Sequence, residues 1–223
     1  MEKKHLRQKL HGITDKWMES RLFKWIDSRI SKSFRKRLKN DNFTILCSNC
    51  IGGTIYHRLG KRFLTPTINL YIPQPDFVQF CLHLDYYLAQ EIHFVESGNK
   101  YPVGELRGDG ADKRTITIHF NHDRDPENAR QKWDDRKARI VRDNLYIIVY
   151  NTDGVTVDEL KELEQVPCRN KVVLTAKPLP EISWSFYIKP VMSHSFPYAY
   201  LGKDVFGRRY YERKFDIVSF LNR

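Results

Sequence analysis

The amino-acid sequence predicts an α/β protein: a three-layer α/β/α domain with a mainly parallel or mixed sheet, preceded by a basic amphipathic helical arm. After residue 40, short runs rich in β-branched and aromatic residues alternate with helical segments at least four times. This alternation is typical of βαβ units around a parallel sheet. Before residue 40, apolar residues recur with a helical period. Because 223 residues suffice for one sizeable core, we expect an arm over residues 1–40 and one α/β domain over residues 41–223.

The arm carries most of the net charge of +11. Residues 1–40 contain 13 basic and four acidic residues, whereas charges in the rest of the chain nearly balance. Apolar residues between Leu6 and Leu38 recur mostly three, four or five positions apart, and Trp17 and Trp25 are among them. A basic amphipathic stretch with two tryptophans is typical of a segment that binds an anionic membrane surface. The alternative is one or two helices that pack on the main domain with solvated lysines.

The sequence also predicts where the protein resides. No apolar run approaches the roughly 20 residues of a membrane-spanning helix, and the first thirty residues are charged where a signal peptide is apolar. We expect a cytoplasmic protein that lies peripherally on the inner face of the cytoplasmic membrane through residues 1–40. No nucleic-acid-binding motif or aromatic stacking platform accompanies the charge, so no specific nucleic-acid partner is expected.

The first elements of the domain are predicted in chain order. A buried strand at 43–47 is followed by a short helix at 51–59 and a strand at 67–72. Pro75 suits the first turn of a helix over 74–88. Three further strands are predicted at 91–95, 103–106 and 115–120, where antiparallel pairing is expected.

The second half of the domain begins with Asp125, which is the expected N-cap of a helix that extends to about Val141. The apolar run 145–150 is the clearest strand of the chain. Thr156 and Glu159 have the spacing of a capping box, which starts a helix that ends near Glu164. Strands are expected at 171–176 and 185–189, and the last helix covers 214–221.

The four cysteines, at positions 47, 50, 81 and 168, are expected to be reduced thiols in an intracellular chain. Cys47 and Cys50 form a C-x-x-C pair, a spacing found in redox and zinc sites. A zinc site needs a second close pair of ligands, and neither Cys81 with His83 nor Cys168 has that spacing. We therefore predict no metal site, and the sequence identifies no cofactor.

The first candidate site is the loop between the first strand and its helix, where an open α/β sheet binds ligands. Cys50 lies where the helix begins, and the helix dipole is expected to lower the pKa of the thiol and favour a nucleophilic thiolate. Gly52 and Gly53 allow close approach, and Ser48 and Asn49 complete the predicted substrate-binding loop. The alternative is a small buried thiol at a tight turn, with the glycines giving room for packing.

The second candidate site is the segment from Ile118 to Asp123, where a strand ends. His119 or His122 is expected to be the general base for Cys50 or for a substrate hydroxyl. The alternative is that these histidines are structural.

The third candidate site is the helix that follows, with Trp133, Arg136 and Arg139. Its arginines can hold a phosphate or a carboxylate, so the three residues are predicted to bind substrate. Asp143, beyond the helix, can orient a histidine. The alternative is a charged helix with internal ion pairs.

Several separated motifs of this chain resemble those of a bacterial family commonly labelled exopolysaccharide biosynthesis protein. The resemblance runs from about residue 35 to the C-terminus and rests on seven segments in the same order: 43–56, 70–73, 101–104, 118–122, 132–136, 143–145 and 170–175. It implies an α/β/α domain and a context of capsule, lipooligosaccharide or exopolysaccharide gene clusters, without an established reaction.

The family pattern has positions that correspond to the candidate residues. The resemblance places its functional side chains at these positions: Cys50, Gly52, Gly53, His119, His122, Trp133 and Arg136. The chain departs from the pattern at Ile51, where the family typically has tryptophan, and at Cys47 with Ser48. The second departure argues against a redox pair of cysteines.

These patterns together predict a transferase of polysaccharide biosynthesis that modifies a glycan or a lipid-linked sugar precursor, with acyl transfer through Cys50 as the preferred reaction. One alternative is a glycosyltransferase-like enzyme that uses a sugar nucleotide, with arginines on the diphosphate. Another is a non-catalytic accessory protein of polysaccharide assembly that binds glycan or a partner with its aromatic segment, residues 184–211.

Overall fold

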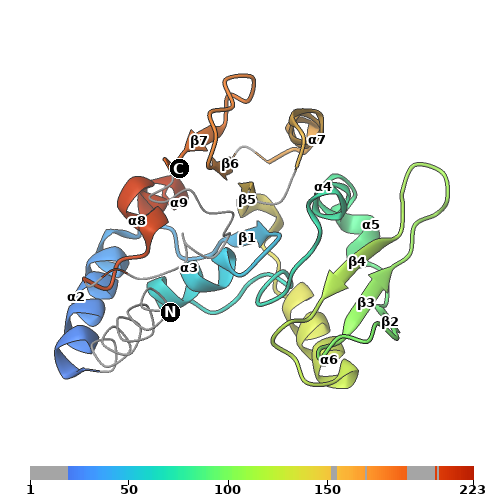
Figure 1. Ribbon diagram of the computed structural model, residues 1–223, viewed down its shortest axis with the longest axis horizontal. Coiled ribbons are helices and arrows are strands. Elements are labelled where there is room, and N and C mark those ends of the chain that lie inside the picture. Colours follow the sequence, from blue (N-terminus) through green and yellow to red (C-terminus); the bar gives the residue numbers. More distant parts are fainter. Residues whose placement is uncertain (1–19, 152–154, 169, 190–203, 205) are drawn as a thin grey trace, which may run out of the picture.

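The computed structural model describes residues 20–151, 155–168, 170–189, 204 and 206–223. Four parallel strands form the main sheet in the order β1-β5-β6-β7. Their bounds are Thr44–Cys47 for β1, Leu145–Asn151 for β5, Asn170–Thr175 for β6 and Ser185–Tyr187 for β7. This sheet with its helices confirms the predicted α/β fold class (Figure 1).

Helices cover both faces of the main sheet. Neighbouring positions in a strand point to opposite sides, so the strands contribute alternate residues to two buried clusters. Ile45 and Ile148 belong to one buried cluster. Its helices are α2 (Arg21–Arg37), α3 (Ile51–Leu59), α8 (Tyr210–Lys214) and α9 (Ile217–Leu221). Leu46 and Ile147 belong to the other cluster. Three of its helices are α4 (Gln74–Leu82), α5 (Leu84–Leu88) and α7 (Val157–Glu162), and α7 continues into the 3-10 turn Leu163–Gln165. The domain therefore has three layers.

A second, antiparallel sheet lies beside the main one (Figure 1). Its strands are β2 (His93–Val95), β3 (Val103–Leu106) and β4 (Ile116–His119). Helix α6 (Pro126–Lys137) follows β4 and packs Trp133 against Phe120, with ring centroids 6.4 Å apart. Trp133 and Ile118 belong to the same buried cluster as Leu46 of the main sheet. One continuous core therefore joins the two sheets.

The segment between α3 and α4 connects the carboxyl ends of β1 and β4. The N–H of Ile72 donates to the carbonyl oxygen of Ser48, directly after β1, at 2.9 Å. Tyr71 forms an isolated antiparallel bridge with His119, the last residue of β4, through backbone hydrogen bonds of 2.8 and 2.9 Å. This segment thus places the end of β4 beside the loop that follows β1.

Several predicted elements differ from the observed ones. The predicted strand at 67–72 is wrong: in this fully described segment Tyr71 is the one bridge residue, and Asn69, with a φ angle of 58°, interrupts the extended run. The helix predicted over 74–88 is divided at His83, whose φ of −118° and ψ of 42° are not helical. Helix α6 ends at Lys137 instead of Val141 and is followed by the 3-10 turn Arg142–Asn144.

The described part of the predicted arm is helix α2, which packs on α3. Ser20 caps its first turn by accepting a hydrogen bond from the N–H of Phe23 at 3.1 Å. Because Phe23 and Phe34 are buried, this helix follows the alternative in which the arm packs on the main domain. Residues 1–19, with Trp17, lie outside the described residues. In the described part of the chain, no helix combines the length and the apolar character needed to cross a bilayer.

Candidate functional site

The loop after β1 presents the thiol of Cys50 at the start of α3. β1 ends at Cys47 and α3 begins at Ile51, so Cys50 is the N-cap residue of the helix. Its side chain makes no capping hydrogen bond. Asn49 Oδ1 accepts one from the N–H of Ile51 instead, at 3.0 Å. Because Asn49 satisfies this N–H group, the sulfur of Cys50 is left for another contact.

That contact is with His122, whose Nε2 lies 3.5 Å from Sγ of Cys50. The distance suits a hydrogen bond that involves sulfur, and the tautomer of the imidazole decides which group donates. His122 is exposed and Cys50 is half-buried, so solvent and substrate can reach the pair. A thiol beside an accessible imidazole is the arrangement of a nucleophile and its general base.

Partial burial raises the pKa of the Cys50 thiol above the ordinary value of 9.0. This direction is opposite to the lowering predicted from the helix dipole, and its cause is desolvation of the thiolate. Cys50 is consequently a thiol at neutral pH. It needs a base within reach to become a nucleophile, and His122 is in that position.

Asp123 fixes the loop that carries His122. Its N–H donates to the carbonyl oxygen of Phe120 at 2.9 Å, and its carboxylate forms an ion pair with Lys132 of α6. The Asp123 side chain is only 5% exposed, so the carboxylate that anchors the loop to α6 is buried. Sequence analysis missed this role, because a pairing across nine positions follows from the turn between β4 and α6 and not from a helical spacing.

His119 has different surroundings from His122. Its ring lies against Tyr71 and Tyr101, with centroids 5.6 and 6.0 Å away. Its Nδ1 is buried and has no hydrogen-bond partner among the described residues. Burial lowers the pKa of His119 below the ordinary value of 6.5, so this ring is neutral at physiological pH. Of the two predicted bases, His122 is the one that the structure brings to the thiol.

Ser48 and Asn49 make contacts within the chain. Ser48 is fully buried, and its hydroxyl accepts a hydrogen bond from Nε2 of Gln74 at 3.0 Å. Gln74 also donates to the carbonyl oxygen of Tyr150 at 3.0 Å, which joins the loop after β1 to α4 and β5. Asn49 caps α3. Both polar side chains therefore position the loop, and their binding of substrate stays a prediction.

Gly52 and Gly53 allow α3 to lie close to its neighbours. A methyl group added to Gly52 would lie 3.3 Å from Cβ of Cys47, and one added to Gly53 would lie 2.7 Å from Oδ1 of Asn69. The space in front of both glycines is thus filled by β1 and the 68–69 segment. This is the packing role that the alternative interpretation of the loop predicts.

Helix α6 places Trp133 in the core. The Trp133 side chain is buried between the rings of Phe80 and Phe120, with centroids 6.1 and 6.4 Å away. Its Nε1 is buried without a hydrogen-bond partner among the described residues. Trp133 therefore stabilises the junction of α4, β4 and α6, and it does not reach Cys50 or His122 at the surface.

Arg136 supports the segment that connects the two sheets. Its Nη1 donates to the carbonyl oxygen of Ile68 at 3.2 Å, and its guanidinium lies over the ring of Phe63, 5.6 Å from the centroid. Burial lowers the pKa of Arg136. The charge of Asp123 acts in the opposite direction, and the charge of neighbouring Arg139 lowers this pKa further. Half-buried Arg136 therefore lies near Asp123 of the turn that carries His122, and the binding of an anion by Arg136 and Arg139 stays a prediction.

Asp143 lies at the other end of the main sheet, which corrects the prediction that it orients a catalytic histidine. It precedes β5, whose first residue, Leu145, is in register with Thr44 at the start of β1. Cys50 follows the opposite end of β1. Because the two strands are parallel and four strand residues span about 13 Å, Asp143 is outside the site formed by Cys50 and His122.

The cysteines show no metal-binding arrangement. Within the described residues, no three His, Cys, Asp or Glu side chains are grouped closely enough to hold a metal ion. All four cysteines are free thiols. Cys47 is fully buried, and burial raises its pKa to about 11. The C-x-x-C pair thus has one accessible member, Cys50.

Two comparisons place the chain among known proteins. A family model described as "Domain of unknown function (DUF1919)" matches residues 22–222. A protein of Haemophilus influenzae strain ATCC 51907, described as an uncharacterized protein, is 35% identical over 199 residues, which cover 86% of this chain and 90% of that protein. The family match begins within α2 and ends one residue after α9, so it includes the helix packed on α3 as well as both sheets.

Proposed function

Because the chain belongs to the family described as a domain of unknown function, DUF1919, we propose a function from the geometry of its own residues: Cys50 and His122 are the nucleophile and the general base of an acyltransferase. The observation that carries this proposal is the 3.5 Å separation of Sγ and Nε2. The accessibility of both side chains supports it, since a structural thiol has no need of an exposed imidazole.

The proposed reaction has two balanced steps. In the first, Nε2 of His122 takes the thiol proton while Sγ of Cys50 attacks the acyl carbonyl, and the leaving group departs with that proton. A thioester on Cys50 remains. In the second, His122 takes the proton of an acceptor hydroxyl, the new ester bond forms, and the Cys50 thiolate leaves and is protonated by His122. The raised pKa of Cys50 makes the base necessary in the first step.

Group transfer explains the cysteines better than redox chemistry does. A dithiol exchange needs two accessible sulfurs, one of which attacks and one of which resolves the mixed disulfide. Cys47 is buried and its pKa is about 11, so it supplies neither a thiolate nor an accessible sulfur. A single accessible thiol with a histidine suits acyl transfer.

The proposed acceptor is a glycan or a lipid-linked sugar precursor of capsule, lipooligosaccharide or exopolysaccharide synthesis, as the resemblance of the motifs implies. The proposed location is the inner face of the cytoplasmic membrane. One feature of α2 supports this location: Trp25 and Leu22 are 59% and 53% exposed, and the guanidinium of Arg29 lies 5.3 Å from the ring centre of Trp25. Exposed tryptophan beside arginine suits an interface with anionic head groups.

The test is genetic complementation in the producing bacterium. A strain that lacks the gene receives the wild-type gene, Cys50→Ser or Cys168→Ser, and the acyl content of its surface polysaccharide is measured by NMR. We expect the deletion to remove one acyl substituent, which wild type and Cys168→Ser restore and Cys50→Ser does not. Cys168 is a matched control, because it is a buried thiol whose Sγ contacts the carbonyl oxygen of Leu145 at 3.1 Å.

Other outcomes contradict the proposal in distinct ways. Full restoration by Cys50→Ser excludes covalent catalysis by the thiol. Loss of a sugar residue in place of an acyl group supports the glycosyltransferase alternative. A polysaccharide that is unchanged by the deletion excludes a role in its modification.

A further inference from the structure

A cavity of about 270 Å³ lies between α2 and α3, on the face of the main sheet that α3 covers. Four of its lining residues are basic: Lys24, Arg35, Arg58 and Arg209. Ligand sites for whole drug-sized molecules are roughly 300–1,000 Å³. The cavity is therefore of a size for a small charged group and not for an entire glycan.

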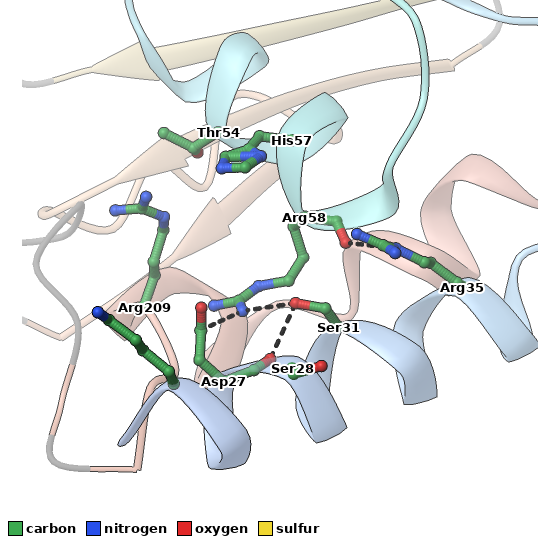
Figure 2. A pocket seen from close by; sticks show the side chains of 9 residues that line it. Asp27, Ser28, Ser31, Arg35, Thr54, His57, Arg58 and Arg209 are labelled. Atoms are coloured by element: carbon green, nitrogen blue, oxygen red, sulfur yellow. Dashed lines mark hydrogen bonds and ion pairs between the residues drawn. The ribbon is translucent and has the colours of Figure 1, made fainter. Parts of the chain in front are cut away.

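The side chain of Arg58 lines this cavity and is held in one position by its hydrogen bonds. Its guanidinium donates to both carboxylate oxygens of Glu212 at 2.9 Å and to Oδ1 of Asp27 at 2.6 Å. It also donates to the hydroxyl of Ser31 and to the carbonyl oxygen of Gly207. With the Arg58 side chain only 4% exposed and two carboxylates on it, its charge is compensated within the protein. Figure 2 shows Arg58 between Asp27 and Ser31.

Lys24 and Arg35 add positive charge beside this network. Arg58, Asp27 and Glu212 together carry one net negative charge, which the charges of Lys24, Arg35 and Arg209 exceed. Neither Lys24 nor Arg35 forms an ion pair within the described residues, and Arg35 Nε donates a weak hydrogen bond to the carbonyl oxygen of Arg58 at 3.4 Å. The two residues are eleven positions apart in α2, which is close to three helical turns. They therefore lie on one face of the helix, together with Ser28 and Ser31 between them.

We propose that this cavity binds a phosphate group of a ligand. Phosphate takes charge-assisted hydrogen bonds from arginine and lysine and further hydrogen bonds from hydroxyls. The cavity provides this set: Lys24, Arg35 and Arg209 around it, and the hydroxyl of Ser28 along α2. The hydroxyl of Ser31 is not part of the set, because it donates to the carbonyl oxygen of Asp27 at 2.9 Å. Figure 2 shows the guanidinium of Arg209 extending into the space below Thr54 and His57, across from α2.

One wall of the cavity is formed by α3, the helix that begins directly after Cys50. Thr54 and His57, which line the cavity, follow Cys50 by four and seven positions, and these spacings share one helix face. The rise of the helix puts them about 6 and 10 Å from Cys50 along its axis. In this part the inference rests on the proposed function: the glycan precursor carries a phosphate, which is held in the cavity while its sugar extends toward Cys50.

The phosphate site is tested by calorimetric titration of the full chain with inorganic pyrophosphate. The test variant is Lys24→Gln/Arg35→Gln. The matched control is Lys32→Gln/Lys36→Gln, which removes the same charge from exposed positions of α2 that do not line the cavity. Hydrogen bonds between charged groups contribute roughly 1.5–3 kcal/mol each, so we expect the test variant to bind at least about tenfold more weakly. The control is expected to change the affinity less than about twofold.

Two further arms identify the source of the phosphate. One titrates a soluble sugar nucleotide, UDP-glucose, and the other measures sedimentation with vesicles of phosphatidylglycerol or, as a neutral comparison, phosphatidylcholine. Binding that the test variant loses and the control keeps supports the site in either arm, and the arm in which it occurs names the source. Equal loss in both variants, or no binding of pyrophosphate, nucleotide or anionic vesicles by the wild type, overturns the site.

The phosphate site and the acyltransferase proposal can fail independently of each other. Cys50→Ser removes the nucleophile without touching the cavity, so it is expected to bind pyrophosphate with wild-type affinity. If the complementation experiment fails while this titration succeeds, the phosphate site stands and the thiol chemistry does not. If the titration fails while Cys50→Ser abolishes polysaccharide acylation, the converse holds.

Discussion

The sulfur of Cys50 lies 3.5 Å from Nε2 of His122, although 72 positions separate these residues in the chain. Cys50 belongs to the loop after β1 in the main sheet, and His122 belongs to the turn after β4 in the small sheet. The backbone bridge between Tyr71 and His119 holds the end of β4 beside that loop. The pair is therefore a product of how the two sheets pack, and disturbing their junction should separate thiol and imidazole.

Iodoacetamide should alkylate Cys50 alone in the native protein. Cys47, Cys81 and Cys168 are buried, whereas Cys50 is half-buried at the surface. Peptide mass spectrometry after a short reaction is expected to show the label on Cys50, and Cys50→Ala is expected to take up none. Labelling of all four thiols at equal rates in the folded protein would contradict the buried positions of the other three.

The same reaction tests the direction of the Cys50 pKa. Because burial raises this pKa above 9.0, the reactive thiolate fraction should grow about tenfold for each unit of pH below that value. The labelling rate is therefore expected to rise steadily from pH 6 to pH 8.5. A rate that is already constant in this range would show a lowered pKa and a preformed thiolate.

His122→Gln should slow acylation of the enzyme much more than His119→Gln does. General-base assistance contributes roughly 10²–10⁴-fold, and His122 is the imidazole at the thiol, whereas His119 is neutral and packs between Tyr71 and Tyr101. The measurement is the rate of p-nitrophenol release from p-nitrophenyl acetate. Equal losses in the two variants, with both proteins folded by circular dichroism, would contradict the assignment of His122.

Arg58→Met should destabilise the protein strongly. The substitution leaves the carboxylate of Glu212 buried and unpaired, a situation that costs about 3–5 kcal/mol. The matched variant is Arg37→Met, whose ion pair with Asp216 is half exposed and is worth about 1 kcal/mol or less. Urea unfolding measures both. A loss of the same small size in the two variants would show that the Arg58 network contributes little to stability.

Gly53→Ala should be destabilising through Asn69. The added methyl group would lie 2.7 Å from Oδ1 of Asn69. Because this atom ends a half-buried side chain that can turn aside, the cost is expected at the low end of the range for overpacking, about 1 kcal/mol. Asn69→Gly removes the close atom and also suits the φ angle of 58° at this position. In the Asn69→Gly background, Gly53→Ala should therefore cost clearly less.

Urea unfolding of the double-mutant cycle measures this coupling. Gly52→Ala is the comparison, because its added methyl group would meet Cβ of Cys47 at 3.3 Å. Asn69→Gly should not relieve its cost. If the costs of Gly53→Ala and Asn69→Gly simply add, the packing of α3 on the 68–69 segment is looser than described.

Local signals in the sequence predicted local structure well. The capping box of Thr156 and Glu159 is present with both reciprocal hydrogen bonds, and Asp125 caps α6 as predicted. The alternation of strands and helices predicted the layered α/β fold. Asn69 shows the limit of this approach, since a single left-handed residue removed a strand that its neighbours favour.

The sequence allowed those site residues to be predicted that lie at the ends of helices and strands. Cys50 could be placed at the start of a helix, and both histidines at the end of a strand. Which histidine meets the thiol depends on the turn anchored by Asp123 and Lys132, and no periodicity encodes that contact. Asp143 was misplaced for a related reason, because the parallel register of β1 and β5 sends it to the opposite edge.

The site of acylation tests the central claim most directly. Wild-type protein, Cys50→Ala and His122→Gln are exposed briefly to p-nitrophenyl acetate, and the intact mass and the modified peptide of each are determined. We predict one acetyl group on Cys50 in the wild type, slower accumulation in His122→Gln and none in Cys50→Ala. Equal acetylation of Cys50→Ala, or release of p-nitrophenol by the wild type without an adduct on Cys50, would contradict the account.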